Sequence, residues 1–495
     1  VESCARIRHN LFDKIQSLGF AETDTSGTST LITRMTSDVN QVQNGLNMFL
    51  RLFLRSPFVV FGSMIMAFTV DLRGALIFAV TIPVLAVVVF GIMLNTMPKY
   101  KKVQGQLDRL TGITRENLTG VRVIRVFGRE QDEEDLFREA DAGLTAAQLR
   151  VGRISALMNP LTYVIINLAL VVILQTGAAE VNTGAIAVGS VVALVNYMNQ
   201  ILLELIKLAN LIVQITRAAA CADRIEMVME LQPRMTFGSA RPDPSSSENA
   251  VEFRHVGLTY PGAGGESLSD ISFTARKGQT IGIIGGTGSG KTSLVSLIPR
   301  YYDATAGEIR IFGRDVREYD KDSLRRSAST VMQRAQLFSG TIRSNLLWGD
   351  ADATDEQLWK ALETAQAAEI VRGKPGKLDE PVEQGGHNFS GGQRQRLSIA
   401  RSLVPEPQIL ILDDSSSALD YATDAALRKA LRQLPRDMTV FIVSQRASSL
   451  SHADQILVLD EGRLVGLGTH QELLAGCEVY RDIYESQFSK SREAV

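Results

Sequence analysis

The amino-acid sequence predicts an α-helical membrane domain followed by a soluble α/β domain that contains a phosphate-binding loop. Long apolar runs lie within residues 46–215, whereas residues 251–495 have the composition of an ordinary soluble protein. Between them, residues 232–250 contain three prolines and a run of serines, which is typical of a linker. The expected organisation is a membrane domain over residues 1–231, a linker over 232–250 and an α/β domain over 251–495.

Composition narrows the classes of protein to which the chain can belong. The 495 residues include 52 Lys and Arg against 54 Asp and Glu, a formal net charge of −2. This balance argues against a general nucleic-acid binder, which would show a basic excess. The three cysteines, Cys4, Cys221 and Cys477, are far apart in the sequence, so we expect neither a disulfide framework nor a CxxC-type metal site.

Four apolar segments are candidate membrane spans: residues 53–70, 75–97, 154–176 and 184–205. A run of about 20 apolar residues is long enough to cross a hydrocarbon core of about 30 Å. Short turns join the first two segments and the last two, whereas the connection over residues 98–153 carries eleven Lys and Arg. The positive-inside rule places this basic connection in the cytoplasm and the two turns outside.

Polar residues follow one face of the fourth candidate span and its continuation: Asn196, Asn199, Gln200, Lys207, Asn210 and Gln214. Within a bilayer such a face must contact protein or water rather than lipid. Three interpretations explain this polar face. It packs against polar groups of another helix, it already lies in the cytoplasm, or it forms the wall of a translocation cavity.

A glycine-rich segment, GGTGSGKT at residues 285–292, matches the phosphate-binding pattern GxxxxGK[ST] without a mismatch. It follows an apolar strand-like segment and precedes a helix-like run. Glycines allow backbone N–H groups to wrap a phosphate, so we expect Lys291 to reach the β- and γ-phosphates and the Thr292 hydroxyl to ligate Mg²⁺. The predicted nucleotide contacts here are Gly285, Gly286, Thr287, Gly288, Ser289, Gly290, Lys291, Thr292 and Ser293.

Two further segments accompany the phosphate-binding loop. An apolar run over residues 409–412 ends at Asp413, which we expect to hold Mg²⁺ beside that loop. Such a run is common in α/β proteins and alone is weak evidence for a metal site. The phosphate-binding loop that precedes it in the sequence strengthens the prediction. The segment FSGGQRQR at residues 389–396 offers N–H groups and a hydroxyl to a phosphate, although the bare pattern also fits a simple helix cap.

With these motifs, the α/β domain resembles the nucleotide-binding domain of an ATP-binding-cassette (ABC) transporter. Tyr260 corresponds to the aromatic residue that stacks on adenine, and residues 285–292 correspond to the Walker A loop. Gln333 corresponds to the Q-loop glutamine, which contacts Mg²⁺ and the membrane domain. Asp413 corresponds to the Walker B aspartate, and Asp420 to the aspartate of the D-loop. The signature motif corresponds to Ser390, Gly391, Gly392 and Gln393, with Phe389 in place of the usual leucine.

The first half is similar to the membrane domain of the exporter type, in which six spans precede the cassette and short coupling helices dock on cassettes. Residues 25–38 resemble the first cytoplasmic loop, and residues 120–123 resemble the second coupling helix. Because only four spans are found, we expect two more to precede residue 1. The resemblance implies ATP and Mg²⁺ as cofactors, a multi-pass position in the inner (plasma) membrane and a cytoplasmic nucleotide-binding domain.

Two positions depart from the family pattern. The glutamate that usually polarises the attacking water is replaced by Asp414, whose side chain is one methylene, about 1.5 Å, shorter. The histidine that usually contacts the γ-phosphate is replaced by Gln445, which cannot carry a proton. A misplacement of about 1 Å can cost about 10²-fold in rate. Asp414, Gln445 and Gln333 remain the candidates for the catalytic step.

These departures predict a degenerate ATP site that binds ATP well and hydrolyses it poorly. In the family, each site takes its signature motif from the other cassette, so the intact SGGQ would complete a partner's competent site. We expect one subunit of a heterodimeric exporter of drugs, lipids or peptides. A homodimeric exporter with competent Asp/Gln sites and an ATP-gated membrane regulator are the alternatives. The predicted spans and the balanced charge argue against a soluble ATPase acting on DNA or ribosomes.

Overall fold

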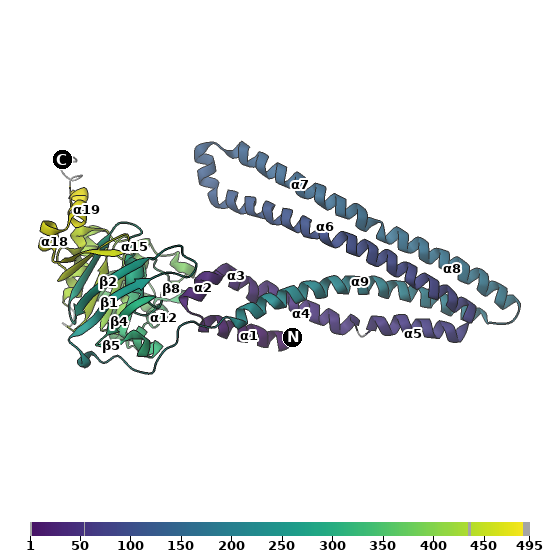
Figure 1. Cartoon of the computed structure of the whole chain (residues 1–495), viewed down its shortest axis with the longest axis horizontal. Helices are drawn as coiled ribbons and strands as arrows, with labels where there is room; N and C mark the ends of the chain where they lie inside the picture. The colour runs from purple at the N-terminus through teal and green to yellow at the C-terminus, as the bar shows by residue number, and fades with distance from the viewer. Residues whose placement is uncertain (1, 54, 434–436, 489–495) are drawn as a thin grey trace. The chain divides into compact units, whose positions relative to one another are not determined.

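The chain forms two units, a helical one and an α/β one (Figure 1). The computed structural model describes residues 2–53, 55–433 and 437–488. The helical unit comprises residues 1–16 and 29–230, and the α/β unit comprises residues 17–28 and 231–495. The division near residue 230 lies beside the linker expected from sequence, whereas the membership of residues 17–28 in the α/β unit was not predicted.

The helical unit consists of long helices joined by short turns. Its elements are α1 (Glu2–Ser17), α3 (Thr28–Thr33), the π-helical turn η1 (Arg34–Asp38), α4 (Val39–Met48), the π-helical turn η2 (Phe49–Phe53), α5 (Arg55–Val70), α6 (Leu72–Phe127), α7 (Glu130–Ala156), α8 (Met158–Asn182) and α9 (Val188–Glu230). Helices α6 and α7 pack side by side, and α9 packs against α4, α5 and α8 (Figure 1). The Asp71 carboxylate caps α6 by accepting a hydrogen bond from Gly74 N, which explains the abrupt turn after α5.

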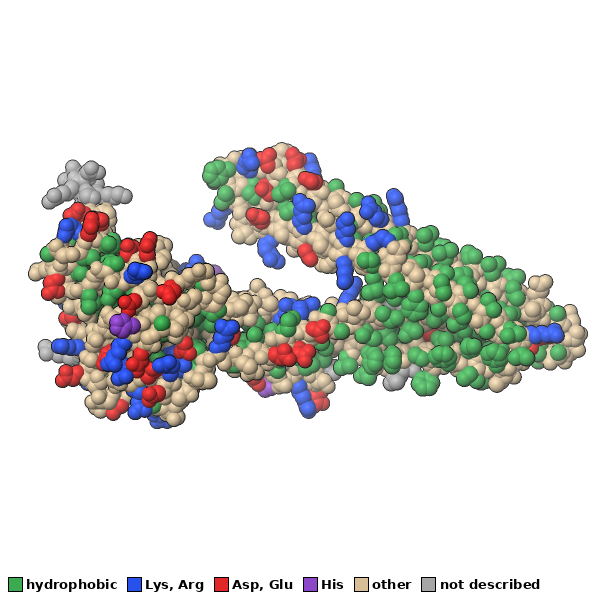
Figure 2. All heavy atoms as spheres, in the orientation of Figure 1, with side chains coloured by type: hydrophobic (Ala, Val, Ile, Leu, Met, Phe, Trp, Pro, Cys, Tyr) green, Lys and Arg blue, Asp and Glu red, His purple; other side chains and the backbone are tan. Residues whose placement is uncertain are grey.

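Among the described residues, three helical stretches are long and apolar enough to cross a membrane: Thr28–Val70, Leu72–Phe127 and Glu130–Asn182. They contain the first three predicted spans. The fourth predicted span begins four residues before α9 and otherwise falls in it. Helix α9 is not among the stretches found in the described residues, so the number of spans stays a prediction. Apolar side chains cover much of the outer surface of the unit, and charged side chains gather where α6 meets α7 (Figure 2).

The interior of the helical unit is built from one side of each long helix. Phe78 and Leu85 of α6 pack with Ile166 of α8 and with Leu194 and Met198 of α9. The opposite side of α9 carries part of the predicted polar face. Asn196, Asn199 and Gln200 are exposed there, while the side chain of Asn210 lies outside the described residues.

A buried carboxylate near this face was missed by the sequence analysis. Glu204 is 2% exposed and accepts hydrogen bonds from Ser56 Oγ at 2.6 Å and from Lys207 Nζ at 2.9 Å. Lys207, one of the six predicted polar positions, is therefore paired within its own helix. Ser56 lies on α5, so the interaction also links α5 to α9.

The two segments that resemble cytoplasmic loops differ from expectation. Residues 120–123 lie inside α6, which accommodates Gly120, continues to Phe127 and ends at Gly128, where φ is +62°. The tip of the α6–α7 hairpin is therefore at residues 127–129. The segment expected to be the first loop, residues 25–38, begins at the end of the short helix α2 (Phe20–Ser26), which belongs to the α/β unit. Residues 28–38 of this segment form α3 and η1.

Within its described residues, the α/β unit contains three sheets. A four-stranded antiparallel sheet has the order β2-β1-β4-β5, a six-stranded sheet has the order β12-β11-β3-β10-β9-β6, and β7 pairs with β8. The strands are β1 (Asn249–Leu258), β2 (Leu268–Arg276), β3 (Thr280–Gly285), β4 (Ala306–Ile311), β5 (Arg314–Asp315), β6 (Ala328–Val331), β7 (Gly340–Thr341), β8 (Pro381–Val382), β9 (Ile409–Asp413), β10 (Thr439–Val443), β11 (Gln455–Asp460) and β12 (Arg463–Gly468).

Helices and short turns connect these strands. They are η3 (Pro244–Ser246), α10 (Lys291–Ser296), η4 (Val316–Glu318), α11 (Lys321–Ser327), α12 (Ile342–Leu346), α13 (Asp355–Thr364), α14 (Ala368–Arg372), η5 (Lys377–Asp379), η6 (Gln384–Gly386), α15 (Gly391–Leu403), α16 (Tyr421–Arg432), α17 (Ala447–Leu450), α18 (His470–Gly476) and α19 (Glu478–Phe488).

The centre of the six-stranded sheet positions the functional residues. Strands β3, β10 and β9 are adjacent and parallel, and all five residues of β9 are buried. Continuous apolar strands of this kind are typical of parallel sheets covered on both faces. Because the carboxyl ends of parallel strands meet at one edge, the residues that follow β3, β9 and β10 converge there.

Candidate nucleotide site

The glycine-rich loop of residues 286–290 connects β3 to α10. Gly288 and Gly290 have φ angles of +84° and +93°, in the left-handed region that favours glycine. At Gly290, an added Cβ would lie 2.7 Å from Leu268 Cδ2 and 2.9 Å from Ser267 O. The predicted strand–loop–helix arrangement is therefore present, and backbone geometry favours glycine at positions 288 and 290.

Lys291 is the first residue of α10, and its side chain folds back into this loop. Its ammonium group donates hydrogen bonds to Gly285 O at 2.9 Å, to Gly286 O and to Ser289 Oγ at 3.3 Å. Burial lowers the pKa of Lys291, and the nearby carboxylates of Asp413 and Asp414 oppose this shift. The loop thus holds a cation at its centre, where a phosphate anion would be stabilised by charge-assisted hydrogen bonds.

Asp413 and Thr292 form the part of the site that fits a magnesium ion. Asp413 is the last residue of β9, is 4% exposed and accepts a hydrogen bond from Thr292 Oγ1 at 3.1 Å. Burial raises the pKa of the Asp413 carboxyl, so a divalent cation would favour its ionised form. Carboxylate, hydroxyl and amide oxygens are the ligand types that Mg²⁺ prefers, and Gln333 adds an amide to the same cavity.

Asp414 has an unusual backbone conformation. Its φ is +45°, a left-handed value that Asp and Asn adopt more readily than most residues, and its N–H donates to Val443 O at 3.1 Å. Burial raises the pKa of Asp414, while Gln333, Lys291 and Arg446 lower it. The Asp414 carboxylate and the Gln333 amide line the same cavity.

Gln445 follows β10 and is exposed at the rim of the cavity. Its backbone is held by a residue that the sequence analysis missed. The Gln487 amide of α19 donates to Gln445 O at 2.7 Å and accepts from Ala447 N at 2.9 Å. The position of this loop thus depends on the C-terminal helix, which no local motif could have indicated.

One cavity of about 560 Å³ collects these groups, a volume typical of a small-molecule site. The predicted residues that line it are Thr287, Gly288, Gly290, Lys291, Thr292, Ser293, Gln333, Asp413, Asp414 and Gln445. Glu266, Ser267, Glu461 and Gly462 also line it and were not predicted. Glu461 and Gly462 form the β11–β12 turn, and their contribution to this cavity depends on the tertiary fold alone.

Comparison with known proteins decides the family. A family description of the ABC transporter transmembrane region matches residues 2–205, and the ABC transporter description matches residues 268–417. An ABC transporter ATP-binding protein of Mycobacterium tuberculosis is 39% identical over 97% of this chain and 83% of its own length. This chain belongs to the ABC transporter family.

Two further comparisons extend the similarity to a named relative and to a solved fold. A probable multidrug resistance ABC transporter ATP-binding/permease protein of Bacillus subtilis is 34% identical over 85% of this chain and 72% of its own length. A solved structure of a bacterial Atm1-family ABC exporter with ATP bound has a TM-score of 0.79 at 23% identity, covering 98% of this chain and 85% of that one. The predicted fold class is confirmed: a helical transmembrane domain precedes an α/β nucleotide-binding domain.

In this ABC transporter, Tyr260 lies beside the cavity rather than in its lining. Its hydroxyl donates to Ser293 Oγ at 3.0 Å, which ties the ring to the residue after Thr292. Its ring meets that of Tyr302 edge to face, with centroids 4.9 Å apart. The structure therefore places the predicted base-stacking aromatic next to the P-loop helix.

The predicted signature residues lie elsewhere in the ABC transporter chain. Ser390 caps α15: Gln393 N donates to Ser390 Oγ at 3.3 Å, and Ser390 N donates to Gln393 Oε1 at 3.0 Å. Asp420 similarly caps α16 by accepting from Thr423 N at 2.9 Å. Among the described residues that line the cavity, none comes from 389–393 or from 417–420. Within one chain, these segments act as helix caps.

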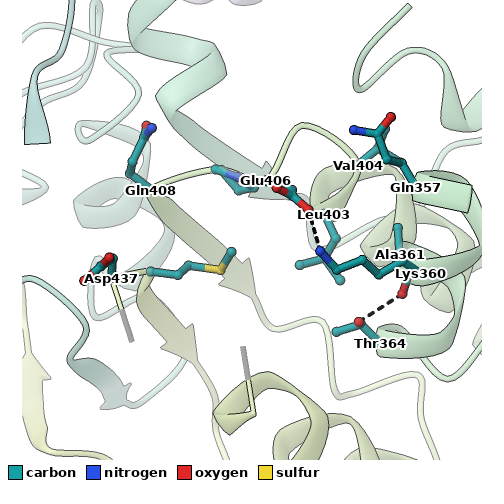
Figure 3. A pocket seen from close by; sticks show the side chains of 11 residues that line it. Gln357, Lys360, Ala361, Thr364, Leu403, Val404, Glu406, Gln408 and Asp437 are labelled. Carbon is teal, nitrogen blue, oxygen red and sulfur yellow. Dashed lines mark hydrogen bonds and ion pairs between the residues drawn. The ribbon is translucent and has the colours of Figure 1, made fainter. Parts of the chain in front are cut away.

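A second cavity, of about 170 Å³, lies in the α/β unit (Figure 3). It is lined by α13, the end of α15 and the residues that precede β9 and β10. The Lys360 ammonium is paired with Glu406 at 2.6 Å, and Asp437 adds another carboxylate (Figure 3). None of its described lining residues is glycine. This cavity lacks the features of a polyphosphate site, so we assign the nucleotide to the P-loop cavity.

Proposed function

We propose that this ABC exporter chain binds Mg-ATP in the P-loop cavity, hydrolyses it slowly there, and forms one half of a heterodimer that exports amphipathic substrates. The proposal depends on which residues, Asp414 and Gln445, stand at the two positions that would activate the attacking water. The side chain of Asp414 is one methylene shorter than the usual glutamate, and the position that would hold a histidine in the same cavity is the neutral Gln445. Asp414 and Gln445 both line the cavity, and we call their part of the lining the hydrolytic edge. A second set of groups, formed by the P-loop, Lys291, Thr292 and Asp413, is the binding edge, and it keeps every residue of the family pattern.

The binding edge supports tight association with the nucleotide. Backbone N–H groups of the P-loop and the Lys291 ammonium would hold the β- and γ-phosphates, and Ser293 would contact the nucleotide at the start of α10. Thr292 and Asp413 would hold Mg²⁺, with Gln333 as a further ligand. Bound Mg²⁺ would neutralise charge on the phosphates. Tyr260 would stack on the base.

The hydrolytic edge supports slow turnover. A general base must reach the attacking water, and its contribution is typically about 10²–10⁴-fold. Asp414 is one methylene shorter than the glutamate it replaces, so its carboxylate reaches less far toward that water. Gln445 can donate a hydrogen bond to a phosphate oxygen but cannot accept and return a proton. We therefore expect ATP to persist in this site once bound.

Two observations support a second chain. Ser390, Gly391, Gly392 and Gln393 are not at this chain's own cavity, so they are available to complete a site on another nucleotide-binding domain. Apolar side chains are also exposed at the tip of the α6–α7 hairpin, where Val126 is 78% and Phe127 is 73% exposed. On the α/β unit, the rings of Phe338 and Trp348 stack at 4.2 Å and are both exposed. Surfaces of this kind are typical of protein interfaces.

The membrane unit supports an apolar or amphipathic substrate. Its helices are apolar enough to span a bilayer, which in this proposal is the inner membrane with the α/β unit in the cytoplasm. Asn196, Asn199 and Gln200 are exposed on α9 and offer hydrogen-bonding groups between apolar surfaces. The Bacillus subtilis relative is named for multidrug resistance, which fits this substrate class.

The steady-state ATPase rate of the chain purified alone in nanodiscs tests the proposal, with ATP binding measured in the same sample. We expect ATP to bind and turnover to be slow, and Asp414→Glu combined with Gln445→His to accelerate it. Fast turnover by the unmodified chain would instead favour a homodimeric exporter with competent Asp/Gln sites. ATP-dependent accumulation of a fluorescent amphipathic dye in vesicles, measured with a partner half-transporter, separates a pump from an ATP-gated regulator.

A further inference from the structure

Helix α2 packs on the α/β unit through an aromatic contact and a buried carboxylate. Phe20 stacks on Tyr301 with ring centroids 4.6 Å apart, and the Arg325 guanidinium lies over both rings. Glu22 is 8% exposed, accepts from Gly19 N at 2.9 Å and accepts from Arg234 N at 3.2 Å. These contacts anchor α2, which the chain connects to α1 and α3 of the helical unit.

A separate line of contacts leads from α2 to the nucleotide cavity. The Tyr302 hydroxyl donates to Asp24 Oδ2 at 2.5 Å, and the Tyr302 ring meets Tyr260 edge to face at 4.9 Å and 90°. Tyr260 in turn donates to Ser293 Oγ at 3.0 Å, and Ser293 lines the cavity. Four side chains therefore form an unbroken path from α2 to the P-loop helix.

The chemistry of Tyr302 suits it to hold a neighbouring ring. Burial and the adjacent Asp24 carboxylate raise the pKa of the Tyr302 phenol, so it stays protonated and donates at neutral pH. Edge-to-face contacts fix the relative planes of two rings, and the Asp24 hydrogen bond fixes the Tyr302 ring from its other end. With the Ser293 bond, the orientation of Tyr260 is determined at both its hydroxyl and its edge.

We propose that Tyr302 is a positioning residue that holds Tyr260 in the plane required for stacking on the nucleotide base, and that its bond to Asp24 makes this affinity depend on the seating of α2. The proposal rests on the proposed role of Tyr260 as the base-stacking residue. Because coupling between two sites is reciprocal, bound ATP would strengthen the seating of α2 by the same factor. Tyr302 would thus report base occupancy to α2 by a route independent of Gln333.

The test compares the affinities of Mg-ATP and of inorganic tripolyphosphate with Mg²⁺, measured on the full chain in nanodiscs. Tyr302→Leu should weaken ATP binding by about 3- to 10-fold, in line with an aromatic contact of this kind, and leave tripolyphosphate binding unchanged within about twofold. Tyr302→Phe keeps the ring and loses the hydroxyl, so it should weaken ATP binding by about two- to threefold. Asp24→Ala should match Tyr302→Phe, and the double variant should show no further loss.

Two variants serve as controls. Tyr480→Leu removes a buried tyrosine that packs in a different hydrophobic cluster, where its hydroxyl contacts His470 Nδ1 at 2.7 Å, and should leave ATP affinity within about twofold. Tyr260→Leu should weaken ATP but not tripolyphosphate. Equal weakening of both ligands by Tyr302→Leu, or equal effects of Tyr480→Leu and Tyr302→Leu on ATP, would overturn the positioning role. If Tyr260→Leu leaves ATP affinity unchanged, the base-stacking assignment itself is wrong, which separates the two failures. Because Tyr302→Phe is conservative, a folding defect in Tyr302→Leu does not prevent the test.

Discussion

The two edges of the P-loop cavity differ in how firmly their side chains are held. On the binding edge, Lys291 is buried and donates to three groups of its own loop, and Asp413 is buried against Thr292. On the hydrolytic edge, Gln445 is exposed at the rim and Asp414 is only partly buried. The contrast indicates a site built to retain nucleotide, in which the groups that would activate water are the least well placed.

Removal of the lysine from the binding edge should have the largest effect. Lys291→Ala eliminates charge-assisted hydrogen bonds to the phosphates, each worth about 1.5–3 kcal/mol, so ATP affinity should fall by about 100-fold. Equilibrium binding of a fluorescent ATP analogue measures this. Lys360→Ala is a matched control in the same unit, because Lys360 pairs with Glu406 at the second cavity. A loss of similar size in the control would contradict the assignment of the site.

Restoration of the hydrolytic edge should have the next largest effect. Asp414→Glu with Gln445→His supplies a longer carboxylate and a proton-carrying ring, so turnover should rise by about 10- to 100-fold while ATP affinity stays the same. Initial rates of phosphate release measure this. Unchanged turnover in a double variant that still binds ATP would show that these two side chains do not limit hydrolysis.

The pH dependence of the slow turnover should follow Asp414. A general base acts in its ionised form, and burial raises the pKa of Asp414 above its ordinary value. Turnover should therefore be constant at high pH and fall as the pH is lowered through this raised pKa. Asp414→Asn should abolish the titration, and a pH–rate profile of both proteins tests this. A profile that keeps its acidic limb in the variant would assign the titration to another group.

The smallest effect should come from the helix that supports the hydrolytic edge. Gln487→Ala removes two hydrogen bonds to the backbone at Gln445 and Ala447, each worth about 1 kcal/mol. Hydrogen exchange of residues 444–447 should become faster by up to about tenfold, while ATP affinity is unchanged. Ser486→Ala, in the same helix, is the control. Equal exchange in both variants would show that α19 does not hold this loop.

The contacts of the binding edge could be predicted from local sequence, whereas those of the hydrolytic edge could not. The P-loop was predictable because its key residues lie within a few positions of one another. Gly288 and Gly290 satisfy a backbone requirement that few other residues meet, and Lys291 follows them directly. The cavity brings Gln333 beside Asp414, and Gln487 is hydrogen-bonded to the backbone of Gln445. Both pairs join segments distant in sequence, so no spacing indicated them. The same limit applies to Tyr302, whose neighbours Asp24 and Tyr260 come from separate segments.

In the helical unit, composition predicted apolar helices but not their ends. The segment at residues 120–123 was wrongly expected to be a separate short helix, because α6 continues to Phe127 and turns only at Gly128. Glu204 was also missed, since a single acidic residue between apolar ones carries no signal until Ser56 is placed beside it. Long helices are predictable from hydropathy, whereas their polar contacts depend on packing.

The identity of the nucleotide retained by the chain tests the central claim most directly. The chain in nanodiscs is incubated with Mg²⁺ and radiolabelled ATP, unbound nucleotide is removed rapidly, and the bound fraction is separated into ATP and ADP. The account predicts mostly ATP on the unmodified chain and mostly ADP on Asp414→Glu/Gln445→His. Predominantly ADP on the unmodified chain would show that Asp414 and Gln445 support hydrolysis and would contradict the degenerate-site proposal.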